Sequence, residues 1–182
     1  AVGAKGGEMT RWLNSLGITV FVLKYRNVEY GHPAPLRDAL RAVRTVRSRA
    51  AEWGVQPERI GMLGGSAGGH LTASAGTLFE APEGRTGAAL DRVSGRPDFL
   101  VLVFPVITMQ DPFAHGTSRR ALLGEKPTDD ARHHLSVDEQ TTKDTPPTFL
   151  VHSSADTTVP VENSLLFYQG MRRAKAPIEL HL

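Results

Sequence analysis

The chain of 182 residues lacks cysteine altogether, which excludes disulfides, thiolate metal sites and cysteine nucleophiles. It also lacks any apolar run near the roughly 20 residues that a membrane-spanning helix needs, so we expect no membrane partner. An excess of one charge is missing too, because 21 basic side chains stand against 19 acidic ones, for a formal net charge of +2. That balance argues against a polyanion-binding surface, and we expect no nucleic-acid partner. None of these absences separates a cytoplasmic from a secreted location.

What the sequence does contain is a regular alternation of two patterns. Short, almost continuous apolar runs predict strands buried on both faces, over residues 18–25, 59–64, 98–104, 148–152 and 178–182. Apolar residues at helical spacing predict helices around and between them, over residues 7–16, 35–50, 67–78, 118–123, 129–135 and 161–174. This alternation is typical of a three-layer α/β/α sandwich with a mostly parallel sheet. We therefore expect a single α/β domain over residues 1–182.

Two regions add to this simple alternation. Residues 107–144 form an irregular insertion between late strands, and we expect it to shape the mouth of a pocket. The long helix over residues 35–50 is rich in arginine, which we interpret as a solvated face because leucine and valine already supply the buried stripe. These arginines are Arg37, Arg41, Arg44, Arg47 and Arg49.

A glycine-rich turn joins the second expected strand to the helix that follows it. Its sequence, Gly64-Gly65-Ser66-Ala67-Gly68, matches the G-x-S-x-G pattern of a nucleophile elbow. In such a turn the serine has a strained backbone conformation, and the flanking glycines remove Cβ atoms that would clash. The backbone N–H of Ala67 then faces the developing oxyanion at a helix N-terminus. The pattern indicates Ser66 as a nucleophile.

Other uses of a glycine-rich turn fit this sequence less well. A turn without chemistry is the simplest alternative, since short G-x-S-x-G matches also arise by chance. Dinucleotide binding would need G-x-G-x-x-G and an acidic residue at a strand end about 20 positions later, and a P-loop would need a Lys-Ser/Thr pair. Neither pattern occurs at this turn.

An aspartate follows the fourth expected strand. Asp156 lies in a strand-end loop downstream of Ser66, which fits the order Ser, Asp, His of a hydrolase triad on such a sheet. Its role would be to orient an imidazole and to stabilise the imidazolium. The alternative is a loop aspartate that hydrogen-bonds within its own turn. Position and order favour the catalytic role.

Along nearly its whole length, the chain resembles the bacterial acetyl-esterase and acetylxylan-esterase-like branch of the α/β-hydrolases. The similarity lies in residues 12–18, 22–26, the helix of Asp38 with residues 41–42, 59–60, 64–70, 118–120, 122–124, 145–148 and 156–160. It implies hydrolysis of short-chain acyl esters, such as the acetyl esters of a carbohydrate or another small molecule, through an acyl-enzyme on Ser66. It also implies that no metal or organic cofactor is needed, whereas location in the bacterial cytoplasm and secretion both stay open.

Two parts of the family pattern are missing from the sequence. In the family a glycine-rich oxyanion loop follows a strand that precedes the first helix seen here, and the catalytic histidine follows the last strand. We therefore expect a chain truncated at both ends, with its general base beyond Leu182. His181 is nearest to the expected place but lies within a strand pattern, and His70 and His152 are expected to pack or bond locally.

The remaining histidines do not suggest another site. His32 occupies a turn before a proline, and His115, His133 and His134 lie in the irregular insertion. They lack the sequence spacing to carboxylates that metal ligands show, so we expect no metal site.

Two interpretations of function remain open. The first is a serine carboxylesterase, and the second is a catalytically impaired hydrolase fragment that serves as a binding or assembly module. Loss of the base from a triad costs several orders of magnitude in rate, which gives the second interpretation its weight. The missing strand would lie between the first two expected strands and leave two edges unpaired. We therefore expect a homo-oligomer, either a dimer or a strand-exchanged assembly, unless those two strands pair directly.

Overall fold

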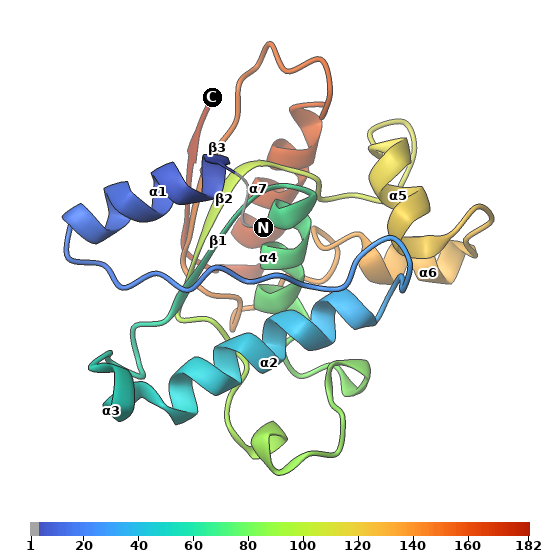
Figure 1. Ribbon diagram of the computed structural model, residues 1–182. Helices are drawn as coiled ribbons and strands as arrows, with labels where there is room; N and C mark the ends of the chain where they lie inside the picture. The colour runs from blue at the N-terminus through green and yellow to red at the C-terminus, as the bar shows by residue number, and fades with distance from the viewer. Residues whose placement is uncertain (1–3) are drawn as a thin grey trace.

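The computed structural model describes residues 4–182 as helices packed around one parallel sheet (Figure 1). Four strands pair in the order β1-β2-β3-β4, with β1 at Gly61–Ser66, β2 at Phe99–Pro105, β3 at Thr148–Val151 and β4 at Ile178–His181. All neighbouring strands are parallel, so their carboxyl ends share one edge of the sheet. Four of the five expected strands and the parallel α/β class are thereby confirmed.

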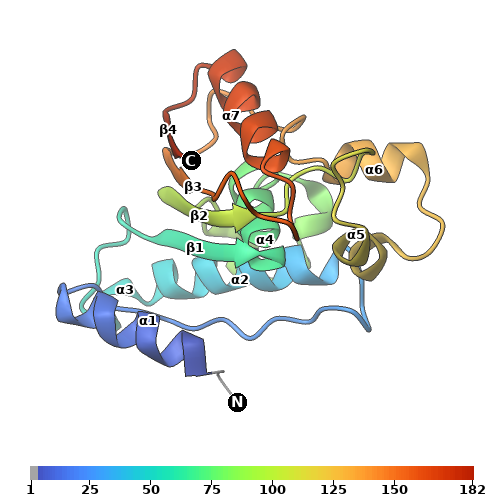
Figure 2. The same cartoon turned by 90° about the horizontal axis from the view of Figure 1, so that it is seen from above.

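The helices follow the apolar periodicity of the sequence to within a few residues. They are α1 Ala4–Ser15, α2 Ala34–Ser48, α3 Ala50–Trp53, α4 Ala67–Thr77, α5 Gly116–Leu123, α6 Asp129–Leu135 and α7 Glu162–Ala174, with short 3₁₀ helices η1 Pro82–Gly84 and η2 Ala89–Arg92. Figure 2 shows α1 on the β1 side of the molecule, α7 on the β4 side, and α5 and α6 beyond the ends to which the strand arrows point. None of the helices within residues 4–182 combines the length and apolar character of a membrane span.

Side chains alternate between a covered and an open face of the sheet. Leu102 and Leu150 are fully buried among residues of α4 and α7, and α2 packs against α4 to extend this covered side. Successive residues of a strand point to opposite faces. On the other face, Leu63, Phe99 and Phe149 are 41–44% exposed. Within the described residues, the apolar core therefore lies on one side of the sheet.

The expected strand over residues 18–25 is absent, and this prediction was wrong. The segment pairs with no strand in the described part of the chain, and β1 pairs only with β2. Side chains hold the segment instead: the Phe21 ring lies 4.9 Å from that of Trp53, and Arg26 forms a two-pronged ion pair with Asp38. An apolar run becomes a strand only when a neighbouring strand accepts its backbone hydrogen bonds, and direct pairing with β1 does not occur.

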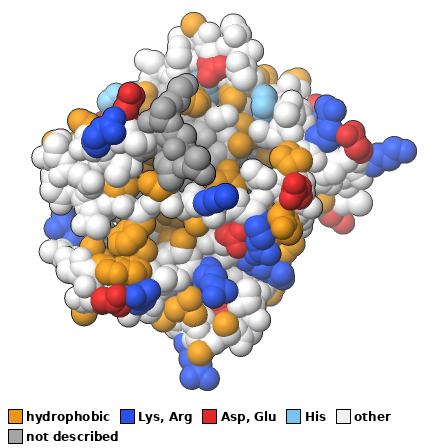
Figure 3. Space-filling model, viewed as in Figure 1, with side chains coloured by type: hydrophobic (Ala, Val, Ile, Leu, Met, Phe, Trp, Pro, Cys, Tyr) orange, Lys and Arg blue, Asp and Glu red, His pale blue; other side chains and the backbone are white. Residues whose placement is uncertain are grey.

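Helix α1 also contributes little to the core. Its residues belong to neither of the two buried clusters among the described residues, and Trp12 in its last turn and Leu16 just after it are more than half exposed. Figure 3 shows hydrophobic side chains in patches between charged ones on the face seen in Figure 1. This side of the molecule thus keeps apolar surface in contact with solvent.

The arginines of α2 do not form a uniformly solvated face, which corrects the sequence interpretation. Arg44 is 3% exposed and donates to the backbone carbonyls of Gly84 and Val93. Arg47 is partly buried as well, and it donates to three backbone carbonyls of the loops that precede β1 and β2. These two side chains tie α2 to loops that follow it in the chain.

Candidate active site

Ser66 stands at the junction of β1 and α4, in a backbone conformation that a serine rarely adopts. Its φ is +52° and its ψ is −125°, and such a conformation costs free energy in any residue with a Cβ atom. The register between β1 and β2 shifts at this point, because Gly65 pairs with Val103 whereas Ser66 pairs with Pro105. Ser66 is half-buried, and its hydroxyl makes no hydrogen bond to another residue of the described chain. The turn therefore presents an uncommitted hydroxyl at the carboxyl edge of the sheet.

The glycines around Ser66 are not equally constrained. A Cβ atom on Gly64 would lie 2.1 Å from the backbone oxygen of Gly68, so only glycine fits at that position. By contrast, a Cβ atom on Gly68 would meet nothing within 4 Å. Gly69, which the motif does not include, would place a Cβ atom 2.6 Å from Cβ of Pro105. The expected steric role holds for Gly64, does not hold for Gly68, and extends to Gly69.

Asp156 follows β3 and is held by its own loop. Its Oδ1 atom accepts hydrogen bonds from the backbone N–H groups of Thr158, at 2.8 Å, and Val159, at 3.0 Å. These two donors keep the pKa of the Asp156 carboxyl below its ordinary value, so the group is ionised at neutral pH. Its other oxygen, Oδ2, lies 3.5 Å from Nε2 of His152. Oδ1 of Asp156 thus forms the hydrogen bonds within its own turn that the simpler interpretation expected. Its Oδ2 atom takes no part in those hydrogen bonds.

Ser66 and Asp156 lie at the same edge of the sheet. Ser66 ends β1, Asp156 follows β3, and only β2 separates the two strands. Adjacent strands are about 4.8 Å apart, so the two strand ends are separated by roughly 10 Å. A side chain placed across the end of β2 would lie between the hydroxyl and the carboxylate.

None of the seven histidines forms a hydrogen bond with Ser66, although all seven lie within the described residues. His152 is buried with both ring nitrogens engaged: Nε2 donates to the carbonyl of Val159 at 3.1 Å, and Nδ1 accepts from the Ser164 hydroxyl at 2.7 Å. His181 lies in β4 with its ring 5.0 Å from that of Phe149.

His70 lies one turn into α4 and is also committed to a structural contact. Its Nε2 lies 2.8 Å from the carbonyl oxygen of Leu135, and the side chain is buried. Burial lowers the pKa of His70 to about 4, so the ring is neutral near pH 7 and donates to that carbonyl. His70 therefore joins α4 to α6 and does not reach the nucleophile.

A cavity of about 260 Å³ opens beside the elbow. Ala67, the residue after Ser66, lines it, as does His70. The irregular insertion over residues 107–144 supplies six lining residues: Met109, Thr117, Ser118, Ala121, Leu122 and Leu135. This volume is just below the range of roughly 300–1,000 Å³ for small-molecule pockets, which suits a short group more than a long acyl chain.

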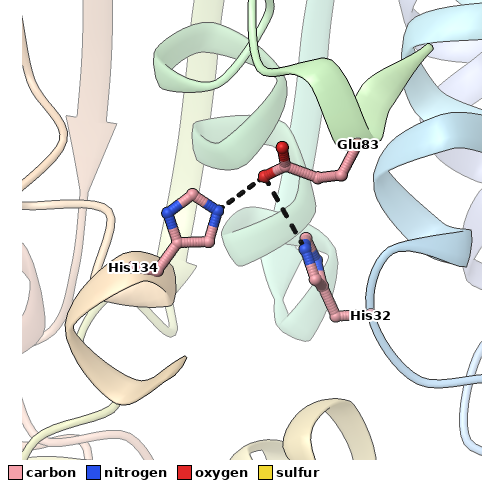
Figure 4. A group of neighbouring side chains, drawn as sticks. All are labelled: His32, Glu83 and His134. Atoms are coloured by element: carbon pink, nitrogen blue, oxygen red, sulfur yellow. Dashed lines mark hydrogen bonds and ion pairs between the residues drawn. The ribbon is translucent and has the colours of Figure 1, made fainter. Parts of the chain in front are cut away.

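A second polar group, which the sequence analysis did not bring together, reaches this cavity through His32. His32, Glu83 and His134 converge from the loop before α2, from η1 and from α6 (Figure 4). Nε2 of His134 lies 2.5 Å from Oε1 of Glu83, and Nε2 of His32 lies 3.8 Å from the same oxygen. The three residues are about 50 positions apart in the sequence, so no local spacing could have revealed them.

The strained serine at a strand-to-helix turn and the aspartate two strands away define an α/β-hydrolase fold. Within that class the chain belongs to the BD-FAE family, which matches it over residues 4–171. The acetyl ester-xyloside bifunctional hydrolase of Caldicellulosiruptor lactoaceticus has a similar structure, with a TM-score of 0.90 and 48% identity over 96% of this chain and 64% of that one.

Two curated relatives are also similar to this chain. Endo-1,4-beta-xylanase B of Butyrivibrio fibrisolvens is 36% identical over 88% of the chain, and an acetylxylan esterase of Xylanibacter ruminicola is 31% identical over 93% of it. The chain spans only 26% and 34% of these two relatives' own lengths. The resemblance to acetyl-esterase-like α/β-hydrolases that the motifs indicated is confirmed by these matches.

Proposed function

We propose that this chain carries the nucleophile and the acid of a serine carboxylesterase that hydrolyses short-chain, acetyl-type esters of carbohydrates or similar small molecules. The observation that supports this most is the backbone of Ser66, which is held at positive φ with its hydroxyl free of other hydrogen bonds among the described residues. Strain of this kind persists only where surrounding structure enforces it, and it is concentrated at functional sites. The names of the relatives agree with an acetyl ester as the substrate.

The reaction would begin with attack of Ser66 Oγ on the ester carbonyl carbon. A histidine takes the hydroxyl proton, and the ionised Asp156 orients that histidine and stabilises its cationic form. The negative charge that develops on the carbonyl oxygen is stabilised by the N–H of Ala67, at the N-terminus of α4. Loss of the alcohol leaves an acyl group on Ser66, which water then removes. Because none of the seven histidines hydrogen-bonds to Ser66 in the described residues, we infer that this histidine comes from outside residues 1–182.

The cavity beside Ala67 supports the preference for short acyl groups. Its volume of about 260 Å³ is small, and apolar side chains of the insertion form much of its wall. We infer that residues 107–144 enclose the acyl or alcohol group of the ester. All of the proposed chemistry comes from side chains and backbone amides, without a cofactor.

Covalent labelling and ester turnover test this proposal together. A protein in which residues 1–182 are completed by the segment that carries the histidine is incubated with a fluorophosphonate probe and, separately, with p-nitrophenyl acetate and p-nitrophenyl octanoate. We expect labelling and acetate turnover that Ser66→Ala abolishes, and faster turnover of the acetate, whereas residues 1–182 alone should turn over either ester several orders of magnitude more slowly because they lack the base. Ser154→Ala is the matched control, because Ser154 is an exposed serine in the Asp156 loop and its removal leaves the elbow intact. Labelling that survives Ser66→Ala would contradict the proposal.

The second candidate, a non-catalytic binding or assembly module, is favoured by one specific observation. Both ring nitrogens of His152, the histidine that lies beside Asp156, are already engaged, and no histidine hydrogen-bonds to Ser66 within residues 4–182. In that case neither labelling nor turnover occurs, while an acetylated xylo-oligosaccharide still protects the chain against thermal unfolding.

We further infer that two copies of the chain associate through the free side of β1. This strand ends the sheet in the described residues, and its unpaired backbone groups are a template for pairing with a second copy. The exposed apolar residues on the adjacent open face would be covered in the same contact.

A further inference from the structure

We propose that His32, Glu83 and His134 form a binding site for one divalent transition-metal ion, for which zinc is the best match. The three side chains come from three separate segments and direct their donor atoms at one point (Figure 4). Their ligand atoms, two imidazole nitrogens and one carboxylate oxygen, all lie within 4.8 Å of one another. Two histidines and a glutamate are an established zinc ligand set that leaves a fourth position for water.

The distances suit a tetrahedral ion after small rotamer adjustments. Zinc bonds of about 2.0–2.2 Å place neighbouring ligand atoms roughly 3.3 Å apart in a tetrahedron. The two distances to Oε1 of Glu83, 2.5 Å from His134 and 3.8 Å from His32, lie on either side of that value. Shifts on the order of 1 Å at the ends of three side chains would bring all three donors into place.

Charge and exposure at the cluster also favour an ion. The carboxylate of Glu83 has no lysine or arginine partner within the described residues, since Arg37 donates to the backbone carbonyl of Glu83 and not to its side chain. The side chains of His32, Glu83 and His134 are 19%, 24% and 42% exposed, which gives an ion a path from solvent to a site that is otherwise shielded.

An ordinary ion pair explains this cluster less well than a metal site does. The described residues contain three other such pairs, His133 with Glu139, His152 with Asp156 and His181 with Glu179, and each joins two residues that are close in sequence. In the cluster a second histidine, His32, approaches the carboxylate oxygen that His134 already contacts. Two imidazoles around one oxygen is an arrangement that a shared cation would stabilise.

An ion at this position would act on the shape of the cavity. His32 lines the cavity beside the elbow, and so does Leu135, the residue after His134. The ion would connect three segments that are distant in sequence, namely the loop before α2, η1 and α6. We therefore assign it a structural role in fixing the cavity wall, separate from the ester chemistry at Ser66.

Calorimetric titration of the chelator-treated chain with Zn²⁺ and, separately, with Mg²⁺ tests the proposal. We expect one Zn²⁺ bound per chain, a higher Tm in its presence, and no comparable binding of Mg²⁺, which prefers oxygen ligands. His32→Ala, Glu83→Gln and His134→Ala should each weaken Zn²⁺ binding by more than about a hundredfold, because even the loss of an outer hydrogen-bond partner costs about 10–100-fold. His133→Ala is the matched control, since it removes the neighbouring histidine of the same helix, and it should leave binding unchanged.

X-ray absorption of the zinc-loaded, unmodified chain provides a measurement that does not depend on the folding of variants. We expect two imidazole nitrogens at about 2.0 Å in the zinc shell. Absence of saturable Zn²⁺ binding would overturn the proposal. So would a zinc shell without two imidazoles, or equal Zn²⁺ affinity in His133→Ala and His134→Ala chains.

Discussion

The two glycines of the elbow motif differ in how far the structure depends on them. A Cβ atom on Gly64 would lie 2.1 Å from the backbone oxygen of Gly68, whereas one on Gly68 would meet nothing within 4 Å. We expect Gly64→Ala to lower the free energy of unfolding by roughly 1–3 kcal/mol or more, because the clash is with backbone that must move. Gly68→Ala should be neutral or stabilising by up to about 1 kcal/mol, since it adds a helix-favouring residue in the first turn of α4.

Urea unfolding of the two variants beside the unmodified chain measures this difference, and each variant is the control of the other. Equal destabilisation by both substitutions would show that the motif glycines act through something other than the close contact at Gly64.

At the scale of residues, the sequence was informative where function depends on a local motif. Ser66 and Asp156 could both be singled out because each follows a strand pattern and their order matches a triad. The group of His32, Glu83 and His134 could not, because its members meet only after three distant segments have packed together. Sequence spacing reports neighbours along a helix or strand, and it carries no information about such contacts.

At the scale of elements, the arginines of α2 show where an amphipathic pattern misleads. Arg44 occupies a buried position, where it donates to the carbonyls of Gly84 and Val93 and pairs with Asp91 at 3.1 Å. The guanidinium thus satisfies backbone groups of a long loop that has little regular structure of its own. A helical wheel marks every arginine as solvent-facing, and it does not show that a later loop covers one of them.

Truncation of Arg44 should therefore loosen the contact between α2 and residues 84–95. We expect Arg44→Ala to lower the free energy of unfolding by on the order of 3 kcal/mol, because two backbone carbonyls lose their donors in a buried place. Arg41→Ala is the matched control, as Arg41 lies on the exposed side of the same helix, and its effect should stay within about 0.5 kcal/mol. Urea unfolding curves give both values, and an equal loss in the two variants would refute a special role of Arg44.

The expected strand over residues 18–25 failed for a different reason. Its apolar, β-branched pattern is that of the strands that did form, such as β2. A segment forms a β-strand only when its backbone hydrogen-bonds to a neighbouring strand. In the described residues, no strand lies on either side of this segment. The pattern identifies a segment able to join a sheet but cannot say whether a partner lies beside it.

At the scale of the whole molecule, the sheet is covered on one face and open on the other. Parallel sheets are normally buried on both faces, and their strands are apolar on both sides for that reason. Here Leu63, Val101 and Phe149 lie side by side on the open face, one on each of the paired strands β1, β2 and β3. The side chains of Leu63 and Phe149 are more than 40% exposed. The sequence predicted apolar strands correctly, but it could not show which face the helices of this chain would leave open.

An open apolar face beside a free strand edge should make the chain associate with itself. We expect the mean sedimentation coefficient to rise with protein concentration. Leu63→Lys combined with Phe149→Lys should weaken the association at least about tenfold, because burial of each apolar side chain contributes on the order of 1 kcal/mol. Tyr30→Lys is the control, since it charges a side chain that is at least as exposed but lies in the turn before α2, away from the sheet. A sedimentation coefficient that stays at the monomer value at every concentration would mean that the open face and the edge of β1 are not sites of self-association. Equal weakening by Tyr30→Lys would instead attribute the effect to net charge, because that substitution adds a positive charge without touching the sheet.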